Sequence, residues 1–226
     1  MDRTDPGFTV EDAGGIVTIT LVRPDRSNAL DEPLLGALKR LLEGLIGQSQ
    51  PRVVVLTGSG RAFCAGADIS AIKGMTDKGE IARIFAPQGE VIGSLVGEVA
   101  ELLFSPRLIS IAAVNGSAIG GGWLLALACD FCLAAASARF WFPEVGLGRA
   151  VSPTAARVVA MKAGGMAARN ILLRASRFTA GDLDGLGLLT AIVTDDALQE
   201  ETRRIAGGLA ASDPVTLSTI KSRIVQ

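Results

Sequence analysis

Two nearly continuous apolar segments in the middle of this chain constrain its fold most strongly. Residues 52–58 read RVVVLTG and residues 108–116 read LISIAAVNG, and glycines and then a helical pattern follow each of them. Strands that are apolar on both faces are buried on both faces, which is typical of parallel sheets covered by helices. Strand and helix patterns alternate along all 226 residues without a repeat or a low-complexity linker. The sequence therefore predicts one α/β unit.

The composition limits the function. The net charge is −1 and there is no dense basic cluster, so we expect no nucleic-acid partner and no binding to an anionic membrane. The chain contains no histidine and no tyrosine, so acid–base chemistry would depend on Asp, Glu, Lys, Cys or bound water. The uncharged stretch from Leu108 to Cys129 reaches the length of a membrane span, but Asn115-Gly116 and the glycines at 120–122 interrupt it.

The three cysteines predict no metal site. Cys129 and Cys132 form a C-x2-C pair, but there is no second pair and no histidine to complete a zinc site. We expect these two thiols and Cys64 to be reduced and buried. The N-terminal residues lack the apolar core of a signal peptide, so we expect a cytoplasmic protein.

Local patterns predict the order of the elements. Gly14-Gly15 joins two short strands as a hairpin, and Asp31, followed by Pro33, is the expected N-cap of a leucine-rich helix. Other expected elements are helices at 81–104, from the glycine trio to 129, at 152–173, at 197–211 and from Asp213-Pro214, a strand at 131–136, and a short capped helix with a strand at 177–193.

Both apolar strands lead to small residues in front of a helix, CAGAD at 64–68 and SAIGGG at 117–122. The first N–H groups of a helix have no partner within it and carry the positive end of its dipole, and small side chains leave them accessible. Two such ends that converge would form an oxyanion hole. A phosphate site and tight backbone packing are the alternatives, although neither a P-loop nor a clean G-x-G-x-x-G is present.

The segment FWFPEVGLG at 140–148 contains a candidate proton carrier. Glu144 follows three bulky apolar residues and Pro143, which favours a dry surrounding for its carboxyl, although a glutamate on a surface loop is the plain alternative. Desolvation raises the pKa of a carboxyl and makes it useful near neutral pH.

Taken together, these segments resemble the enoyl-CoA hydratase/isomerase (crotonase) superfamily. The resemblance rests on LVRPDRSNALDEPLL, AFCAGADI, AAVNGSAIGGG, LACD and FPEVGLG in this order and spacing. It implies an α/β fold, a spiral of ββα units at residues 1–195 and a C-terminal helical segment at 196–226. It also implies an acyl-thioester substrate, bound as coenzyme A or pantetheine without a separate cofactor, and an enolate intermediate.

The resemblance also implies the site residues. The thioester oxygen would bind the N–H groups of Ala67 and Gly121, and Glu144 would be the catalytic acid–base. The substrate would further contact Arg26, Ala65, Asp68, Ile69, Gly120, Trp123, Leu124 and Trp141, although aromatic residues such as the two tryptophans are more often core.

One departure from the family bears on the reaction. Family hydratases use two glutamates to place and activate a water, and the first of them falls here on Leu124. A single base resembles the Δ3,Δ2-enoyl-CoA isomerases, so we expect double-bond isomerisation. The alternatives are hydration or dehydration, or a decarboxylase or carbon–carbon bond enzyme acting on a coenzyme A or carrier-protein thioester. A non-catalytic crotonase-fold partner ranks lower, and RNA binding has little support from the charge.

Two further departures concern the coenzyme and the assembly. Ser70 stands where the family often has a lysine for the coenzyme A phosphates, and Arg26 or Lys73 would have to compensate, which keeps a carrier-protein thioester open. The chain stops at KSRIVQ, short of the usual family end, either naturally or by truncation. The homotrimer or hexamer implied by the family is therefore in doubt.

Overall fold

The computed structural model describes residues 7–68 and 77–224, with the backbone alone for 78–89. Six strands form the larger sheet, in the spatial order β1-β2-β3-β5-β7-β10. Their bounds are Phe8–Ala13 (β1), Ile16–Leu21 (β2), Arg52–Gly58 (β3), Leu108–Val114 (β5), Phe131–Ala135 (β7) and Ala191–Val193 (β10). β1 is antiparallel to β2 and every other neighbouring pair is parallel.

A smaller sheet has the order β4-β6-β8-β9, with β4 (Ala62–Cys64), β6 (Ser117–Ile119), β8 (Arg139–Trp141) and β9 (Phe178–Thr179). The helices are α1 (Glu32–Ile46), α2 (Lys78–Leu103), α3 (Gly121–Ala128), α4 (Pro153–Ala163), α5 (Gly165–Arg174), α6 (Ala180–Asp184), α7 (Leu198–Ala210) and α8 (Pro214–Ile224). Each turn of the chain adds one strand to the larger sheet, one strand to the smaller sheet and then a helix. The successive turns are β3-β4-α2, β5-β6-α3 and β7-β8-α4. This confirms the expected α/β spiral of ββα units.

The larger sheet is buried on both faces, as its apolar strands predict. Alternate residues of β3 belong to different cores: Val54 and Leu56 face one core, and Val53 and Val55 face the other. The first core lies under α1 to α4 and contains the leucines of α1. The second is covered by α7, which contributes Leu198 and other residues. The boundary expected at residue 195 remains a prediction.

Local chemistry explains the ends of several elements. Gly14 and Gly15 both adopt positive φ, 60° and 84°, in the hairpin between β1 and β2. The Asp31 side chain accepts a hydrogen bond from the Leu34 N–H at 3.0 Å and caps α1, as expected. The helical pattern at 152–173 is divided into α4 and α5 at Gly164, which is the C-cap of the first helix and the N-cap of the second. Gly164 adopts φ 78°, a conformation that ends an α-helix.

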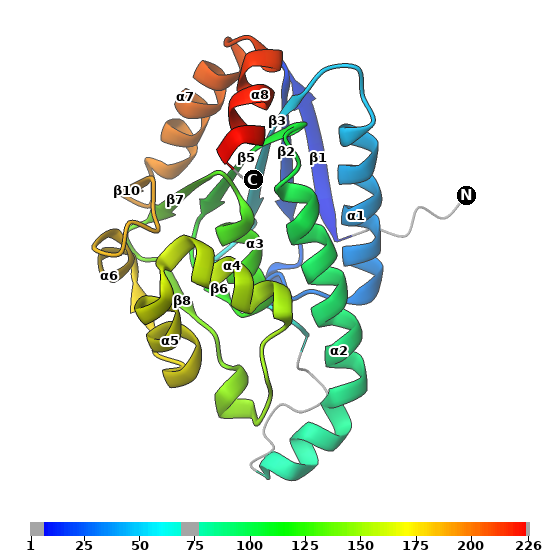
Figure 1. The fold of residues 1–226 in the computed structure, drawn as a ribbon, viewed down its shortest axis with the longest axis vertical. Coiled ribbons are helices and arrows are strands. Elements are labelled where there is room, and N and C mark those ends of the chain that lie inside the picture. The colour runs from blue at the N-terminus through cyan, green and yellow to red at the C-terminus, as the bar shows by residue number, and fades with distance from the viewer. Residues whose placement is uncertain (1–6, 69–76, 225–226) are drawn as a thin grey trace.

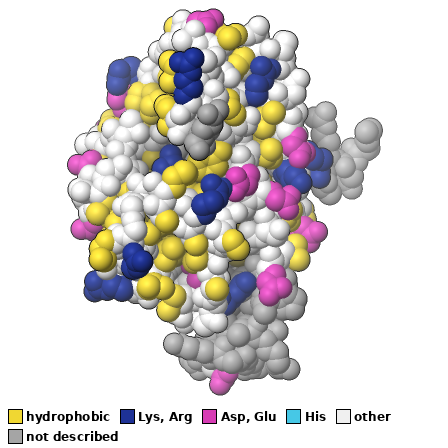
Figure 2. Space-filling view, in the orientation of Figure 1, with side chains coloured by type: hydrophobic (Ala, Val, Ile, Leu, Met, Phe, Trp, Pro, Cys, Tyr) yellow, Lys and Arg dark blue, Asp and Glu magenta, His cyan; other side chains and the backbone are white. Residues whose placement is uncertain are grey.

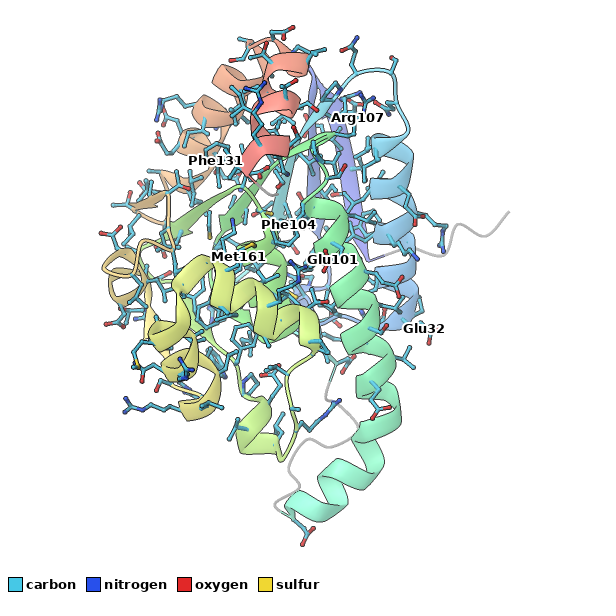
Figure 3. The ribbon with its side chains drawn as sticks, viewed as in Figure 1. Glu32, Glu101, Phe104, Arg107, Phe131 and Met161 are labelled. Carbon is cyan, nitrogen blue, oxygen red and sulfur yellow. The ribbon has the colours of Figure 1, made fainter. Side chains whose placement is uncertain are left out.

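Helices α4 and α5 form an exposed face beside α2. Figure 1 shows α1 and α2 side by side, with α4 and α5 across from α2. Hydrophobic side chains gather on the face that α4 and α5 present (Figure 2), where Met161, Met166 and Leu173 are 50%, 72% and 67% exposed. Arg157 of α4 pairs with Glu101 of α2, and Figure 3 labels Glu101 on the last turns of that helix.

Candidate active site

A cleft of about 1110 Å³ opens where the turns of the spiral meet. Three segments that follow strands of the smaller sheet contribute to it, residues 65–68, 119–121 and 141–144. The loop at 25–29 and the facing sides of α2 and α4 complete the wall. The topology thus brings together the small-residue motifs and the Glu144 segment, which lie far apart in the sequence.

The two glycine turns meet backbone against backbone. A Cβ at Gly66 would lie 2.6 Å from the carbonyl oxygen of Ile119 and 3.4 Å from the nitrogen of Gly121. A Cβ at Gly122 would lie 2.4 Å from the carbonyl oxygen of Cys64. Gly66 and Gly120 also adopt positive φ, 77° and 49°. Since side chains essentially never approach a carbonyl this closely, only glycine fits these turns.

The backbone N–H groups of Ala67 and Gly121 are the candidate donors. Leu30 donates to the Gly66 carbonyl at 2.7 Å and accepts from the Asp68 N–H at 3.0 Å, so Ala67 between them turns its N–H the other way. Gly121 is the first residue of α3, where an N–H has no partner within the helix. Among the described residues, nothing accepts a hydrogen bond from either N–H. Both residues line the cleft.

The Glu144 carboxyl lies directly over the glycine trio. A Cβ at Gly120 would come within 2.8 Å of its Oε1. Its Oε2 is buried and has no hydrogen-bond partner among the described residues. Burial raises the pKa of Glu144, and its own backbone N–H and the Arg149 guanidinium lower it by less. The desolvation expected for this carboxyl is confirmed at Oε2, in a side chain that is half-buried overall, whereas its catalytic role remains a prediction.

The three thiols of the chain do not suit acid–base work. Burial raises the pKa of Cys64, Cys129 and Cys132 to about 12, so these thiols stay protonated near neutral pH.

Across the described ranges, no group of three or more Cys, Asp or Glu side chains could hold a metal ion. Within the same ranges, no helix is both long and apolar enough to cross a membrane.

Apolar side chains form part of the cleft wall. Leu124, one turn into α3, lines the cleft and is 2% exposed. Val96 of α2 lies so close to Gly121 that a Cβ there would be 3.3 Å from either Val96 methyl carbon. Ile92 of α2 and Phe142 also line the cleft. Sequence reasoning missed the two α2 residues, because the pattern of α2 alone does not show which turn faces the cleft.

The expected substrate contact of Trp123 is wrong. Trp123 is 1% exposed and packs against Phe142 and Phe140, with ring centroids 4.9 and 5.7 Å apart. Successive helix residues point about 100° apart, so Trp123 is turned into the core when Leu124 faces the cleft. Trp141 does line the cleft, and the Arg177 guanidinium lies 4.9 Å from its ring centroid.

Charged residues stand around the rim. Arg26 and Asp68 both line the cleft and pair with each other at 3.3 Å, and Ala65 and Gly120 line it as well. Ile69, together with Ser70 and Lys73, lies outside the described residues. Arg149 was missed by sequence reasoning, although it lies five residues after Glu144 and its N–H donates to the Glu144 carbonyl at 2.9 Å.

This geometry is that of an α/β protein with one ligand cleft. Parallel strands lead through glycine turns to the cleft, which holds two backbone N–H donors and the partly buried carboxyl of Glu144. The sequence profile of the family described as "Enoyl-CoA hydratase/isomerase" matches residues 11–226. The chain therefore belongs to the enoyl-CoA hydratase/isomerase family of enzymes.

Individual relatives agree with this assignment. The chain is 32% identical over 216 residues to the short-chain-enoyl-CoA hydratase of Clostridium acetobutylicum, covering 95% of this chain and 79% of that protein. It is 29% identical over 208 residues to the crotonyl-CoA hydratase of Syntrophomonas wolfei, covering 92% and 76%.

Solved structures share the fold. The enoyl-CoA hydratase of Bacillus anthracis superposes with a TM-score of 0.83 at 32% identity, covering 96% of this chain and 82% of that one. An enoyl-CoA hydratase/carnithine racemase of Magnetospirillum magneticum superposes with a TM-score of 0.85 at 30% identity, covering 99% and 80%.

Proposed function

We propose that this enzyme binds an enoyl thioester and shifts its double bond, with Glu144 as the single acid–base group. The observation that carries this proposal is the pairing of one dry carboxyl over Gly120 with the aliphatic Leu124 in the same cleft. The family resemblance puts a second, water-positioning glutamate at the place of Leu124 in hydratases. An aliphatic side chain cannot orient a water molecule, whereas one carboxylate is sufficient to move a proton between two carbons.

The proposed reaction begins with the thioester oxygen between the N–H groups of Ala67 and Gly121. The Glu144 carboxylate removes a proton from the α-carbon of a 3-enoyl thioester, and the electron pair spreads over the γ-carbon and the thioester oxygen. The same carboxyl then returns the proton at the γ-carbon, which leaves the 2-enoyl thioester. Each donor to such an oxygen typically contributes about 10²- to 10³-fold in rate, and the positioned carboxyl about 10²- to 10⁴-fold.

Hydration of a 2-enoyl thioester is the second candidate. The names of the curated relatives favour it, since the Clostridium and Syntrophomonas proteins are called hydratases. In that reaction Glu144 alone would activate the water, and the backbone or the thioester itself would have to position it. The names of the relatives support hydration, and the aliphatic Leu124 in the cleft supports isomerisation. Identifying the reaction product distinguishes the two.

Proton NMR in D2O separates the two reactions. We would incubate the protein with a 3-enoyl-CoA and, separately, with a 2-enoyl-CoA, with Glu144→Gln as the matched control. Isomerisation predicts interconversion with deuterium at the α- or γ-carbon and no 3-hydroxy product. A 3-hydroxyacyl-CoA would contradict the isomerase assignment and support hydration. No reaction with either would leave malonyl-type and carrier-bound thioesters as the next substrates to test.

The coenzyme and the assembly are part of the same proposal. We propose coenzyme A or pantetheine as the carrier of the acyl group, with no separate cofactor, and Arg26 as a contact for its phosphates. Because Arg26 pairs with Asp68, that contact would require the pair to open or to share the guanidinium. We also propose self-association through the exposed apolar face of α4 and α5, since patches of this kind mark contact surfaces. Light scattering would test this, with a monomer mass as the contradicting result.

A further inference from the structure

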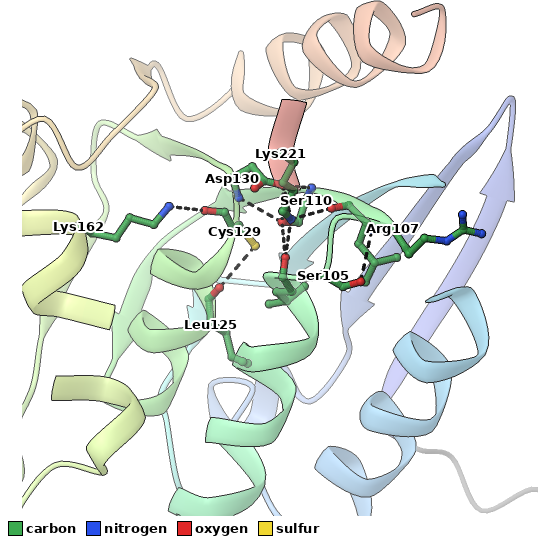
Figure 4. A network of polar contacts seen from close by, with 10 residues as sticks. Ser105, Arg107, Ser110, Leu125, Cys129, Asp130, Lys162 and Lys221 are labelled. Atoms are coloured by element: carbon green, nitrogen blue, oxygen red, sulfur yellow. Dashed lines mark hydrogen bonds and ion pairs between the residues drawn. The ribbon is translucent and has the colours of Figure 1, made fainter. Parts of the chain in front are cut away.

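A network of polar contacts, with the buried Lys221 at its centre, lies at the C-terminal end of α3 (Figure 4). Asp130 follows this helix, and its Oδ2 accepts hydrogen bonds from Lys221 Nζ at 2.8 Å, from the Ser110 N–H at 2.8 Å and from the Ser110 hydroxyl at 3.1 Å. The Asp130 N–H lies 3.1 Å from the Ser110 hydroxyl oxygen. The mechanism proposed above uses none of these groups.

Lys221 connects four separate parts of the fold. It belongs to α8, and its side chain is only 5% exposed. Besides Asp130, its ammonium donates to the carbonyls of Leu103 and Leu108, both at 2.7 Å. All three ammonium hydrogens therefore have partners, at the end of α2, the start of β5 and the end of α3. A buried ammonium is tolerated only when its hydrogen bonds are satisfied in this way.

A second lysine acts on the same end of α3. Lys162 of α4 donates from Nζ to the carbonyl of Cys129, the C-cap of α3, at 3.1 Å. Cations are favourable at the C-terminal end of a helix, where unpaired carbonyls carry partial negative charge. Lys162 thus satisfies the C-cap carbonyl of α3 directly, while Lys221 holds the side chain of Asp130, the residue that follows this cap.

The opposite end of α3 carries the candidate oxyanion donor. There the Gly120 N–H donates to the Trp141 carbonyl at 2.9 Å, and Gly122 lies against Cys64 without room for a Cβ. Every residue of α3 from Gly122 to Ala128 is buried. A helix of this length spans only about 12 Å. A short, closely packed helix moves as one body, so a displacement at its C-terminal end, next to Cys129 and Asp130, reaches Gly121.

We propose that Lys221, through Asp130, and Lys162, through the Cys129 carbonyl, are positioning residues that set where α3 presents the Gly121 N–H to the thioester oxygen. This inference rests on the proposed oxyanion hole. Small errors in position are costly, since a misplacement of about 1 Å can lower a rate about 10²-fold. Neither lysine has to touch the substrate for this effect.

The test follows the polarisation of a bound thioester carbonyl. Difference infrared spectroscopy with ¹³C-labelled butyryl-CoA, which has no double bond to react, measures its C=O stretch. S-butyl-CoA, a thioether without that oxygen, is the matched ligand. We expect Lys221→Met to reduce the downshift of the stretch, to weaken the thioester about tenfold while the thioether binds as before, and to lower kcat on an enoyl-CoA about 10- to 100-fold. A stable variant with wild-type frequency and kcat would overturn the proposal.

Two more variants separate position from stability. Lys221→Met leaves the half-buried Asp130 carboxylate without its ion-pair partner, and adding Asp130→Asn removes that charge. We expect the double variant to regain stability but not the carbonyl shift; recovery of both would overturn the proposal. Lys162 is exposed, so Lys162→Met should fold even if Lys221→Met does not. It should reduce the carbonyl shift in the same direction, and a wild-type frequency there would also overturn the proposal. A wild-type protein that binds thioester and thioether equally, without a shift, would contradict the oxyanion hole itself.

Discussion

Replacing Gly66 by alanine tests whether the two glycine turns form one catalytic unit. The new Cβ would lie 2.6 Å from the Ile119 carbonyl oxygen, about 0.8 Å inside the 3.4 Å at which ordinary contact begins. The oxygen belongs to the backbone and a Cβ is fixed directly to it, so neither atom can rotate away and the turns must separate by most of that distance. Gly66 has φ 77°, where alanine costs about 1–2 kcal/mol.

Gly164→Ala is the matched control for this change. Gly164 has nearly the same φ, 78°, but no atom lies within 4 Å of its Cβ position. Both variants therefore place an alanine at a positive φ, and this backbone strain should lower the melting temperature by about 2–4 °C per kcal/mol in a chain of this size. Only Gly66→Ala should also separate the Ala67 and Gly121 donors.

The assay is the rate of deuterium incorporation into an enoyl-CoA in D2O. A displacement close to 1 Å predicts a loss of about 10²-fold in kcat for Gly66→Ala, whereas Gly164→Ala should stay within about twofold. Calorimetry on both variants measures the loss of melting temperature that the backbone strain causes in each. If Gly66→Ala folds and keeps its rate within about threefold of the wild type, the two turns do not form an oxyanion site and the reasoning fails.

Three other predictions follow from the site. Glu144→Gln should lower proton transfer about 10²- to 10⁴-fold with little change in thioester affinity, and unchanged turnover would exclude this carboxyl as the base. Burial raises the pKa of Glu144 and the Arg149 guanidinium lowers it, so activity should fall as the pH drops through that raised pKa. Arg149→Met removes the lowering charge and should move this acid limb of the pH–rate profile to higher pH. A limb that does not move would refute the coupling between the two residues. Trp123→Ala should lower the free energy of unfolding in urea by about 3–5 kcal/mol. Trp141→Ala should lower that free energy less but reduce kcat/KM more. The reverse order would contradict the assignment of Trp123 to the core and Trp141 to the cleft.

Much of the fold and part of the site could be predicted from local sequence. The hairpin at Gly14-Gly15, the Asp31 cap and the doubly buried strands depend on backbone conformation and burial, which short-range patterns encode directly. The bulky residues before Glu144 likewise pointed to the burial that raises the pKa of its carboxyl.

Other features depended on the tertiary structure. Helix α3 is apolar all round, so its pattern does not indicate that Leu124 faces the cleft and Trp123 the core. The approach of Val96 to Gly121, and the ties from Lys221 and Lys162 to the end of α3, join residues that are far apart in sequence. The sequence determined by itself which turns are rich in glycine and which carboxyl is the candidate for desolvation. Only the tertiary structure decided which side chains surround them, because contacts between distant segments depend on how whole elements pack.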